Sequence, residues 1–189
     1  FTVLVSPSWG PSALLSRYGE KLLDPLVKTG LHVIVRPHPQ SKKSEDAMLS
    51  NLERRYEGKQ NLEWDYSSEN VATLARSDVM ISDFSGIIFD YAFLFDRPFF
   101  YAAADYDDAI YDSSDLEETP WKFKAISEMG IELSESMFSD IGNLVKSAAT
   151  NPELAERRKA ARETAWQYKG NSAVRIADFL VGKQKGISC

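Results

Sequence analysis

The chain has 189 residues, of which 43% are hydrophobic and 12% aromatic, enough for one folded domain with a sizeable core. Its formal charge of −6 is unevenly distributed, because residues 105–118 hold seven acids and no base. The rest of the chain is close to neutral, which excludes a general basic surface for binding nucleic acid. The single cysteine, Cys189, excludes an internal disulfide framework and a multi-cysteine zinc site, and no apolar run approaches the length of a membrane span.

The first part of the chain predicts two strands that each end in a polar loop. Residues 2–6 form a short apolar run typical of a buried strand, and the turn-forming segment Pro7-Ser8-Trp9-Gly10-Pro11 follows it. A helix with a plausible cap at Ser12 is expected up to Gly30. Residues 31–35 predict the second strand, which is closed by Arg36-Pro37-His38-Pro39.

Three further elements lead to the central unit of the chain. We expect a helix over about 44–56, a weak strand over 62–64 and a short helix over 70–75. Residues 79–81 then predict a buried strand that delivers Ser82 and Asp83 at its carboxyl end, and Ser85 and Gly86 are suited to start the next helix. Arg97-Pro98 should stop that helix before a strand over 99–101.

This alternation of strands and helices predicts an α/β fold, with a Rossmann-like parallel sheet flanked by helices. In such sheets, ligands bind outside the carboxyl ends of the strands. The polar segments Ser8-Trp9-Gly10, Arg36-Pro37-His38-Pro39 and Ser82-Asp83-Phe84-Ser85-Gly86 should therefore converge on one crevice.

The segment from Ser82 to Asp90 has a functional and a structural interpretation. The first N–H groups of a helix suit a phosphate, Gly86 would let it approach closely, and Asp90 lies far enough along to meet a ribose hydroxyl. Alternatively, Ser82, Asp83 and Ser85 only cap a helix. Because the neighbours of Asp90 are apolar, we expect a specific hydrogen-bonding partner, either a ribose hydroxyl or a backbone amide or base of the protein.

The rest of the chain is less regular. Residues 102–121 predict a long acidic surface loop, and helices are expected over about 137–150, 151–168 and 173–181. His32 lies inside the second strand and is expected to be structural, and we see no metal-ligand cluster and expect no cofactor.

Four motifs in this order resemble the CDP-glycerol glycerophosphotransferases of teichoic acid and related cell-surface polymer synthesis. They are Pro-Ser-Trp-Gly, Arg-Pro-His-Pro, Ser-Asp-Phe-Ser-Gly-Ile-Ile-Phe-Asp-Tyr-Ala with a following Arg-Pro-Phe-Phe-Tyr, and Gly-Asn-Ser-Ala-Val-Arg-Ile-Ala-Asp-Phe-Leu. The resemblance implies one half of a glycosyltransferase B-type fold with a helical C-terminus, residues 1–189 forming the nucleotide-binding donor domain of a two-domain transferase.

The resemblance also implies roles for single residues. His38 would contact the donor diphosphate and stabilise charge as CMP departs, while Ser82, Ser85 and the Gly86 amide would hold phosphate oxygens. Asp83 and Asp90 would bind donor hydroxyls or orient neighbours. The remaining candidates for nucleotide or phosphate binding are Trp9, Gly10 and Arg36.

The sequence departs from the family pattern in two places. Asp108-Ala109-Ile110-Tyr111 stands where an Arg-Gly pair is expected, and Gly10 stands where the family often has an arginine. The partners implied are a CDP-activated small-molecule donor, a polymer acceptor and a missing N-terminal acceptor domain. A cytoplasmic location is expected, and peripheral association of the full-length protein with the inner face of the membrane is compatible with the family.

Three functions remain open from the sequence. The chain is the donor domain of a transferase that uses CDP-glycerol or a similar CDP-activated polyol phosphate, the donor half of a nucleotide-sugar glycosyltransferase, or a non-catalytic nucleotide-binding module.

Overall fold

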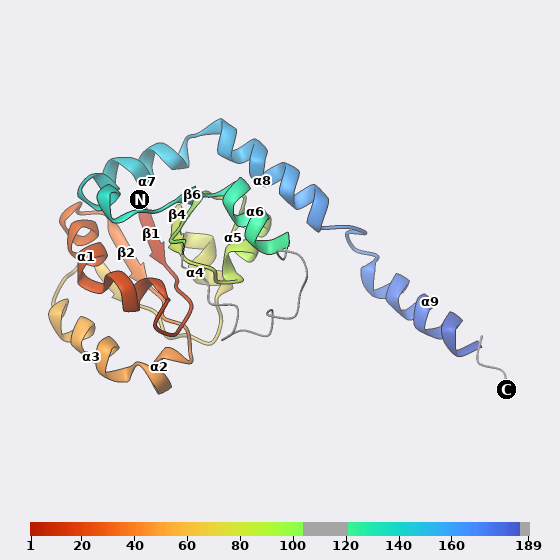
Figure 1. Ribbon diagram of the computed structural model, residues 1–189, viewed down its shortest axis with the longest axis horizontal. Coiled ribbons are helices and arrows are strands. Elements are labelled where there is room, and N and C mark those ends of the chain that lie inside the picture. Colours follow the sequence, from red (N-terminus) through yellow and green to blue (C-terminus); the bar gives the residue numbers. More distant parts are fainter. Residues whose placement is uncertain (104–120, 186–189) are drawn as a thin grey trace.

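The computed structural model describes residues 1–103 and 121–185, which form a layered α/β domain with a helical C-terminal extension (Figure 1). The described residues build a six-stranded sheet in the order β3-β2-β1-β4-β5-β6, and every pair of neighbouring strands is parallel. The strands are β1 Thr2–Val5, β2 His32–Val35, β3 Leu62–Trp64, β4 Val79–Ser82, β5 Phe99–Tyr101 and β6 Ile131–Glu132.

This strand order creates a switch point between β1 and β4. The chain winds from β1 outward to β3, then returns across β1 and winds in the other direction through β4, β5 and β6. Loops that follow β1 and β4 therefore leave the sheet on opposite sides, and in open α/β sheets this switch point is where the ligand-binding crevice lies. The Rossmann-like parallel sheet expected from the sequence is confirmed.

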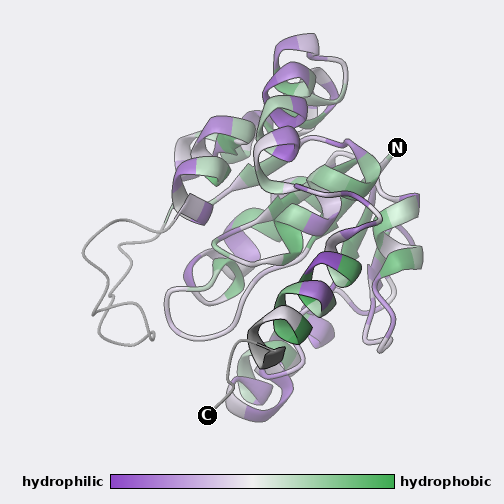
Figure 2. Cartoon of the chain, turned by 90° about the vertical axis from the view of Figure 1, so that its right-hand side faces the viewer, coloured by the Kyte–Doolittle hydropathy of each residue, from purple (hydrophilic) through white to green (hydrophobic). Residues whose placement is uncertain are grey.

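Two hydrophobic cores lie on opposite faces of the sheet because strand side chains alternate. Val3 and Val5 face one core and Leu4 faces the other, and all three are fully buried. In Figure 2 the strands are coloured as hydrophobic, whereas the outer helices also carry hydrophilic residues. The first core is covered by α1 Leu14–Lys28, α3 Asp46–Arg55 and α7 Ile141–Ala149, and the second by α4 Val71–Arg76, α5 Ile87–Phe95 and α6 Trp121–Met129.

The C-terminal part continues as α8 Pro152–Ala165 and α9 Ser172–Lys185. The Asn151 side chain accepts hydrogen bonds from the first turn of α8, which confirms the expected helix start at Asn151-Pro152. Figure 1 shows α9 projecting away from the sheet, and its apolar side chains are more than half exposed. No helix among the described residues combines the length and apolarity needed to cross a membrane.

Several element boundaries differ from those expected. The helix expected over 44–56 corresponds to α3, and a separate short helix, α2 Ser41–Ser44, precedes it. The helix expected from Met137 begins as a 3-10 helix, Glu135–Asp140, before α7. Both α6 and β6 were missed, and β6 has only two residues, too few for any periodicity to show. Most of the long loop expected over 102–121 lies outside the described residues.

Candidate functional site

The three polar loops lie at the carboxyl edge of the sheet, where Asp83 joins the loop after β1 to the loop after β4. Its carboxylate accepts hydrogen bonds from the Ser8 N–H at 3.0 Å to each oxygen, from the Leu14 N–H at 2.9 Å and from the Ser85 N–H at 3.1 Å. Ser8 follows β1, Leu14 begins α1 and Ser85 precedes α5. Asp83 therefore forms the floor of the crevice at the switch point between β1 and β4.

Asp83 is an internal support and is closed to a ligand. Only 1% of the residue is exposed, and both of its oxygens are occupied by backbone N–H groups. Burial raises the pKa of the Asp83 carboxyl above its ordinary value, while the hydrogen bonds from Leu14, Ser8 and Ser85 oppose that rise. Asp83 was expected either to orient its neighbours or to bind donor hydroxyls. This geometry supports the first role and disagrees with the second.

The amino end of α5 is open. Gly86 is the N-cap residue, and no side chain caps this helix. Within the described residues, the N–H groups of Gly86 and Ile87 and the hydroxyl of Ser85 make no hydrogen bond. Gly86 is exposed, and nothing lies within 4 Å of the position that a Cβ atom would take. These groups together can donate hydrogen bonds to an anion, and the positive end of the helix dipole favours its charge.

Ser82 does not share this open position. It is the last residue of β4, it is fully buried, and its hydroxyl donates a 2.6 Å hydrogen bond to the Ser6 carbonyl. The side chain therefore joins β4 to the loop after β1. The expectation that Ser82 holds a phosphate oxygen disagrees with this geometry, because its one donor is already used inside the protein.

His38 has a defined orientation in the loop after β2. Its Nδ1 accepts a hydrogen bond from the Gln40 N–H at 3.1 Å, so Nδ1 carries no proton in this arrangement. The neutral ring consequently has its proton on Nε2, where it is available for donation. The Trp9 indole lies beside the imidazole, with 6.5 Å between ring centroids, and it is 43% exposed.

Gly10 lies in the turn that presents Trp9. Its φ of +99° is a conformation that favours glycine, which explains why an arginine is unsuited to this position here. The Gly10 N–H donates to Glu45 Oε1 at 2.9 Å, so this amide is already used within the protein, although Gly10 was a candidate for phosphate binding. Glu45 was missed because its partners lie 35 and 29 residues away in the chain.

Arg36 is also committed to the protein. Its guanidinium donates to Asp65 Oδ2 at 2.6 Å, to the Ser67 hydroxyl at 3.0 Å and to the Ser67 carbonyl at 2.8 Å. The Arg36 and Asp65 side chains are only 12% and 8% exposed. Arg36 therefore fastens the loop after β3 to the loop after β2, and these contacts do not favour the expected role of Arg36 in binding the ligand.

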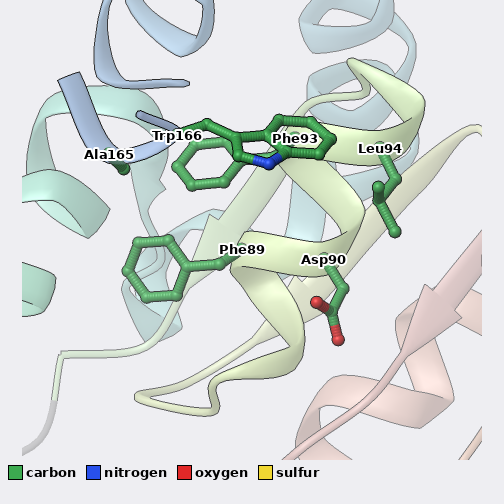
Figure 3. A pocket seen from close by; sticks show the side chains of 6 residues that line it. All are labelled: Phe89, Asp90, Phe93, Leu94, Ala165 and Trp166. Carbon is green, nitrogen blue, oxygen red and sulfur yellow. The ribbon is translucent and has the colours of Figure 1, made fainter. Parts of the chain in front are cut away.

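Asp90 lies on the outer face of α5 in surroundings that differ from those expected. The residue is exposed and, in the described part of the chain, makes no hydrogen bond or ion pair, so its carboxylate needs no protein partner. Figure 3 shows Asp90 at the edge of an open groove of about 310 Å³ between α5 and the end of α8. The groove is lined by Phe89, Asp90, Phe93, Leu94, Ala165 and Trp166.

His32 lies away from the crevice, within β2. Its Nε2 is 3.2 Å from Glu63 Oε2 on the neighbouring strand β3, and the two side chains are about equally exposed. This pairing agrees with the structural role expected for His32. Among the described residues there is no group of three or more histidine, cysteine or acidic side chains placed to hold a metal ion.

Solved structures with a similar fold include transferases of several kinds. The wall teichoic acid polymerase TagF aligns with 97% of this chain at 21% identity and a TM-score of 0.56, and a TagF variant soaked with CDPG aligns with all of it at 20% identity and 0.53. Anabaena HepE in complex with UDP-glucose aligns with 96% at 14% identity and 0.55. The chain spans 43%, 42% and 49% of these structures, so it corresponds to half of a B-type glycosyltransferase fold.

Sequence comparison identifies the family. No relative was found among curated proteins. The family described as CDP-glycerol:poly(glycerophosphate) glycerophosphotransferase matches residues 16–182, which include the crevice loops after β2 and β4 and reach into α9. This chain therefore belongs to the CDP-glycerol glycerophosphotransferase family.

Proposed function

We propose that this chain binds the CDP-activated donor of a glycerophosphotransferase, which moves a polyol phosphate to a hydroxyl of a cell-surface polymer and releases CMP. The observation that carries the proposal is the open amino end of α5 in the crevice of a family member. We further propose that residues 1–189 are the donor half of a longer transferase whose other half binds the acceptor, since the chain spans less than half of TagF.

The donor diphosphate would lie at the start of α5. The N–H groups of Gly86 and Ile87 and the Ser85 hydroxyl supply three donors that no described residue of the protein uses. The absence of a side chain at Gly86 lets phosphate oxygens come within hydrogen-bonding distance of the backbone. Asp90 lies four residues further along, about 6 Å at the rise of an α-helix, which suits a ribose hydroxyl next to the phosphates.

His38 would act on the leaving group. In the transfer, the acceptor oxygen forms a bond to the phosphorus of the polyol phosphate, and the bond from that phosphorus to the CMP oxygen breaks. Negative charge then grows on the CMP phosphate, where the Nε2–H of His38 can donate a hydrogen bond. The acceptor hydroxyl must give its proton to a base, and we assign no residue of this chain to that role.

Binding to the isolated chain tests the proposal. We expect CDP-glycerol and CMP to raise its melting temperature, with CDP-ribitol, UDP-sugars and NAD as comparison ligands. Gly86→Ala should weaken binding of CMP, because the added methyl group occupies the approach of the phosphate, without destabilising the fold. Gly182→Ala in α9 is the matched control, since its Cβ also meets nothing within 4 Å. Equal CMP affinity of the two variants would refute the site.

A nucleotide-sugar glycosyltransferase is the second candidate. The observation that favours it is the similar fold of HepE, whose structure holds UDP-glucose. Stabilisation by a UDP-sugar and not by CDP-glycerol would select this alternative. Stabilisation by CMP alone, without transfer by the full-length protein, would indicate a nucleotide-binding module.

A further inference from the structure

The short loop Ser8-Trp9-Gly10 is held at both ends by carboxylates. Asp83 accepts the Ser8 N–H, and Glu45 accepts the Gly10 N–H at 2.9 Å. Glu45 Oε1 also accepts a 2.8 Å hydrogen bond from the Ser16 hydroxyl in α1. Trp9 lies between the two fixed amides, so its exposed indole is presented by a loop with little freedom to turn.

Glu45 is linked just as directly to the loop of His38. The Ser41 N–H donates to the His38 carbonyl at 2.9 Å, and the Glu45 N–H donates to the Ser41 carbonyl at 2.8 Å. Ser41 is only 2% exposed, so this connection is packed inside the protein. The backbone of Glu45 therefore belongs to the segment after β2, while its side chain reaches the loop after β1.

The turn at Gly10 needs such a restraint. Gly10 has a φ of +99°, and a glycine can adopt many other backbone conformations of similar energy. The residue itself therefore does not fix the turn. Within the loop, the Gly10 carbonyl accepts one hydrogen bond from the Ala13 N–H at 3.1 Å. The Glu45 side chain supplies the remaining contact to the Gly10 amide and so fixes the direction in which Trp9 points.

We infer that Glu45 is a positioning residue of the donor site, which holds Trp9 against His38 by bridging the loops after β1 and β2. Its identified side-chain contacts are to protein groups, and it acts on the ligand through Trp9 and His38. The effect of Glu45 on a ligand rests on the proposed function, because that proposal is what places a nucleotide beside Trp9 and His38. The bridge itself is a property of the ligand-free chain.

Two variants separate hydrogen bonding from charge. Glu45→Ala removes the acceptor, whereas Glu45→Gln removes the charge and keeps an oxygen that can accept from Gly10 and Ser16. Glu57→Ala is the matched control, because Glu57 is an exposed acid that follows α3 and lies outside the bridge. If Glu45→Ala does not fold, Glu45→Asp, whose carboxylate is one methylene shorter, takes its place.

The first measurement is the NMR spectrum of the His38 ring in the ligand-free chain, assigned with the help of His32→Ala. Trp9→Ala gives the shifts of His38 without the neighbouring indole. We expect Glu45→Ala to move the His38 signals toward those of Trp9→Ala, and we expect Glu45→Gln and Glu57→Ala to leave them in place. Unchanged signals in Glu45→Ala, or equal changes in Glu45→Gln, would overturn the inference.

The second measurement is the affinity for CMP by calorimetric titration. Loss of one positioning hydrogen bond should weaken CMP binding about three- to tenfold in Glu45→Ala, with near wild-type affinity in Glu45→Gln. An affinity equal to that of the wild type in Glu45→Ala would contradict a role in positioning the ligand. If the wild-type chain binds no nucleotide, the proposed function fails, and the His38 signals still decide whether Glu45 sets the two rings.

Discussion

Arg36→Met should destabilise the fold much more than it weakens donor binding. The guanidinium pairs with Asp65, and both side chains are largely buried. Methionine keeps most of the apolar stem and removes the charge and the donors. The variant therefore tests whether this arginine is part of the protein framework or reads the phosphates, as its place in Arg36-Pro37-His38-Pro39 first suggested.

The expected loss of stability depends on the hydrogen bonds that Asp65 retains in Arg36→Met. Breaking a buried ion pair from one side costs about 3–5 kcal/mol, because the other charge is left without compensation. Here the carboxylate retains hydrogen bonds from the Ser67 N–H, the Ser67 hydroxyl and the Thr73 hydroxyl. We therefore expect the lower end, about 3 kcal/mol, which corresponds to a fall in Tm of about 6–12 °C for a chain of this size.

The pH dependence gives an independent check. Burial would raise the pKa of the Asp65 carboxyl, but hydrogen bonds from Ser67, Thr73 and Arg36 outweigh it, and the pKa lies well below its usual range. A lowered pKa contributes stability that is present above the unfolded value of about 3.9 and is lost as the pH falls toward the folded value. Because Arg36→Met removes the guanidinium and leaves the burial, the Asp65 pKa should be higher in the folded variant than in the wild type, and the difference in stability should shrink once the pH falls below that higher pKa.

Urea unfolding at pH 7 and pH 3.5, with CMP titration at pH 7, would measure both effects. Arg76→Met is a suitable control, because Arg76 pairs with Glu63 on the surface, where an ion pair contributes little. The reasoning would be refuted by an Arg36→Met chain that unfolds like the wild type and binds CMP much more weakly. Arg36 would then be a ligand residue in spite of its contacts.

Three further substitutions test single assignments. Asp90→Asn should weaken CMP binding about tenfold and leave Tm nearly unchanged, since Asp90 has no partner among the described residues. Calorimetric titration with CMP and thermal melting would measure both effects, with Asp178→Asn as the control. In the longer transferase proposed above, His38→Ala should lower turnover at saturating donor about 100-fold or more with little change in donor affinity, whereas His32→Ala should not lower turnover. Ser82→Ala should cost about 1 kcal/mol in urea unfolding and leave CMP affinity unchanged, because its hydroxyl bonds only within the protein.

The position of the crevice could be predicted from the sequence, because it depends on the order of the strands and on local sequence patterns. Short apolar runs predicted β1, β2, β4 and β5, and the ends of these strands share one edge of a parallel sheet. The expected start of a helix near Gly86 is confirmed for the same reason: the signals for a helix start are close together in the chain. By contrast, β6 pairs over two residues that carry no pattern of their own.

The roles of the polar side chains were harder to predict, because their partners are distant in sequence. Ser82 and Asp83 find their partners about 75 residues away, after β1, and Arg36 pairs with Asp65 across 29 residues. Residue type and spacing cannot distinguish a hydroxyl that supports a neighbouring loop from one that remains open, as Ser82 and Ser85 illustrate.

The two groups of polar residues at this edge have complementary tasks. Asp83, Glu45 and Arg36 hold the loops after β1, β2, β3 and β4 to one another, and they satisfy buried or half-buried backbone and side-chain groups in doing so. This internal bonding holds the His38 Nε2–H and the amino end of α5 in place, and neither has a hydrogen-bonding partner in residues 1–103 or 121–185. Donors that are held in position before a ligand arrives need no rearrangement to meet its charge, which is the condition for stabilising a phosphoryl transfer electrostatically.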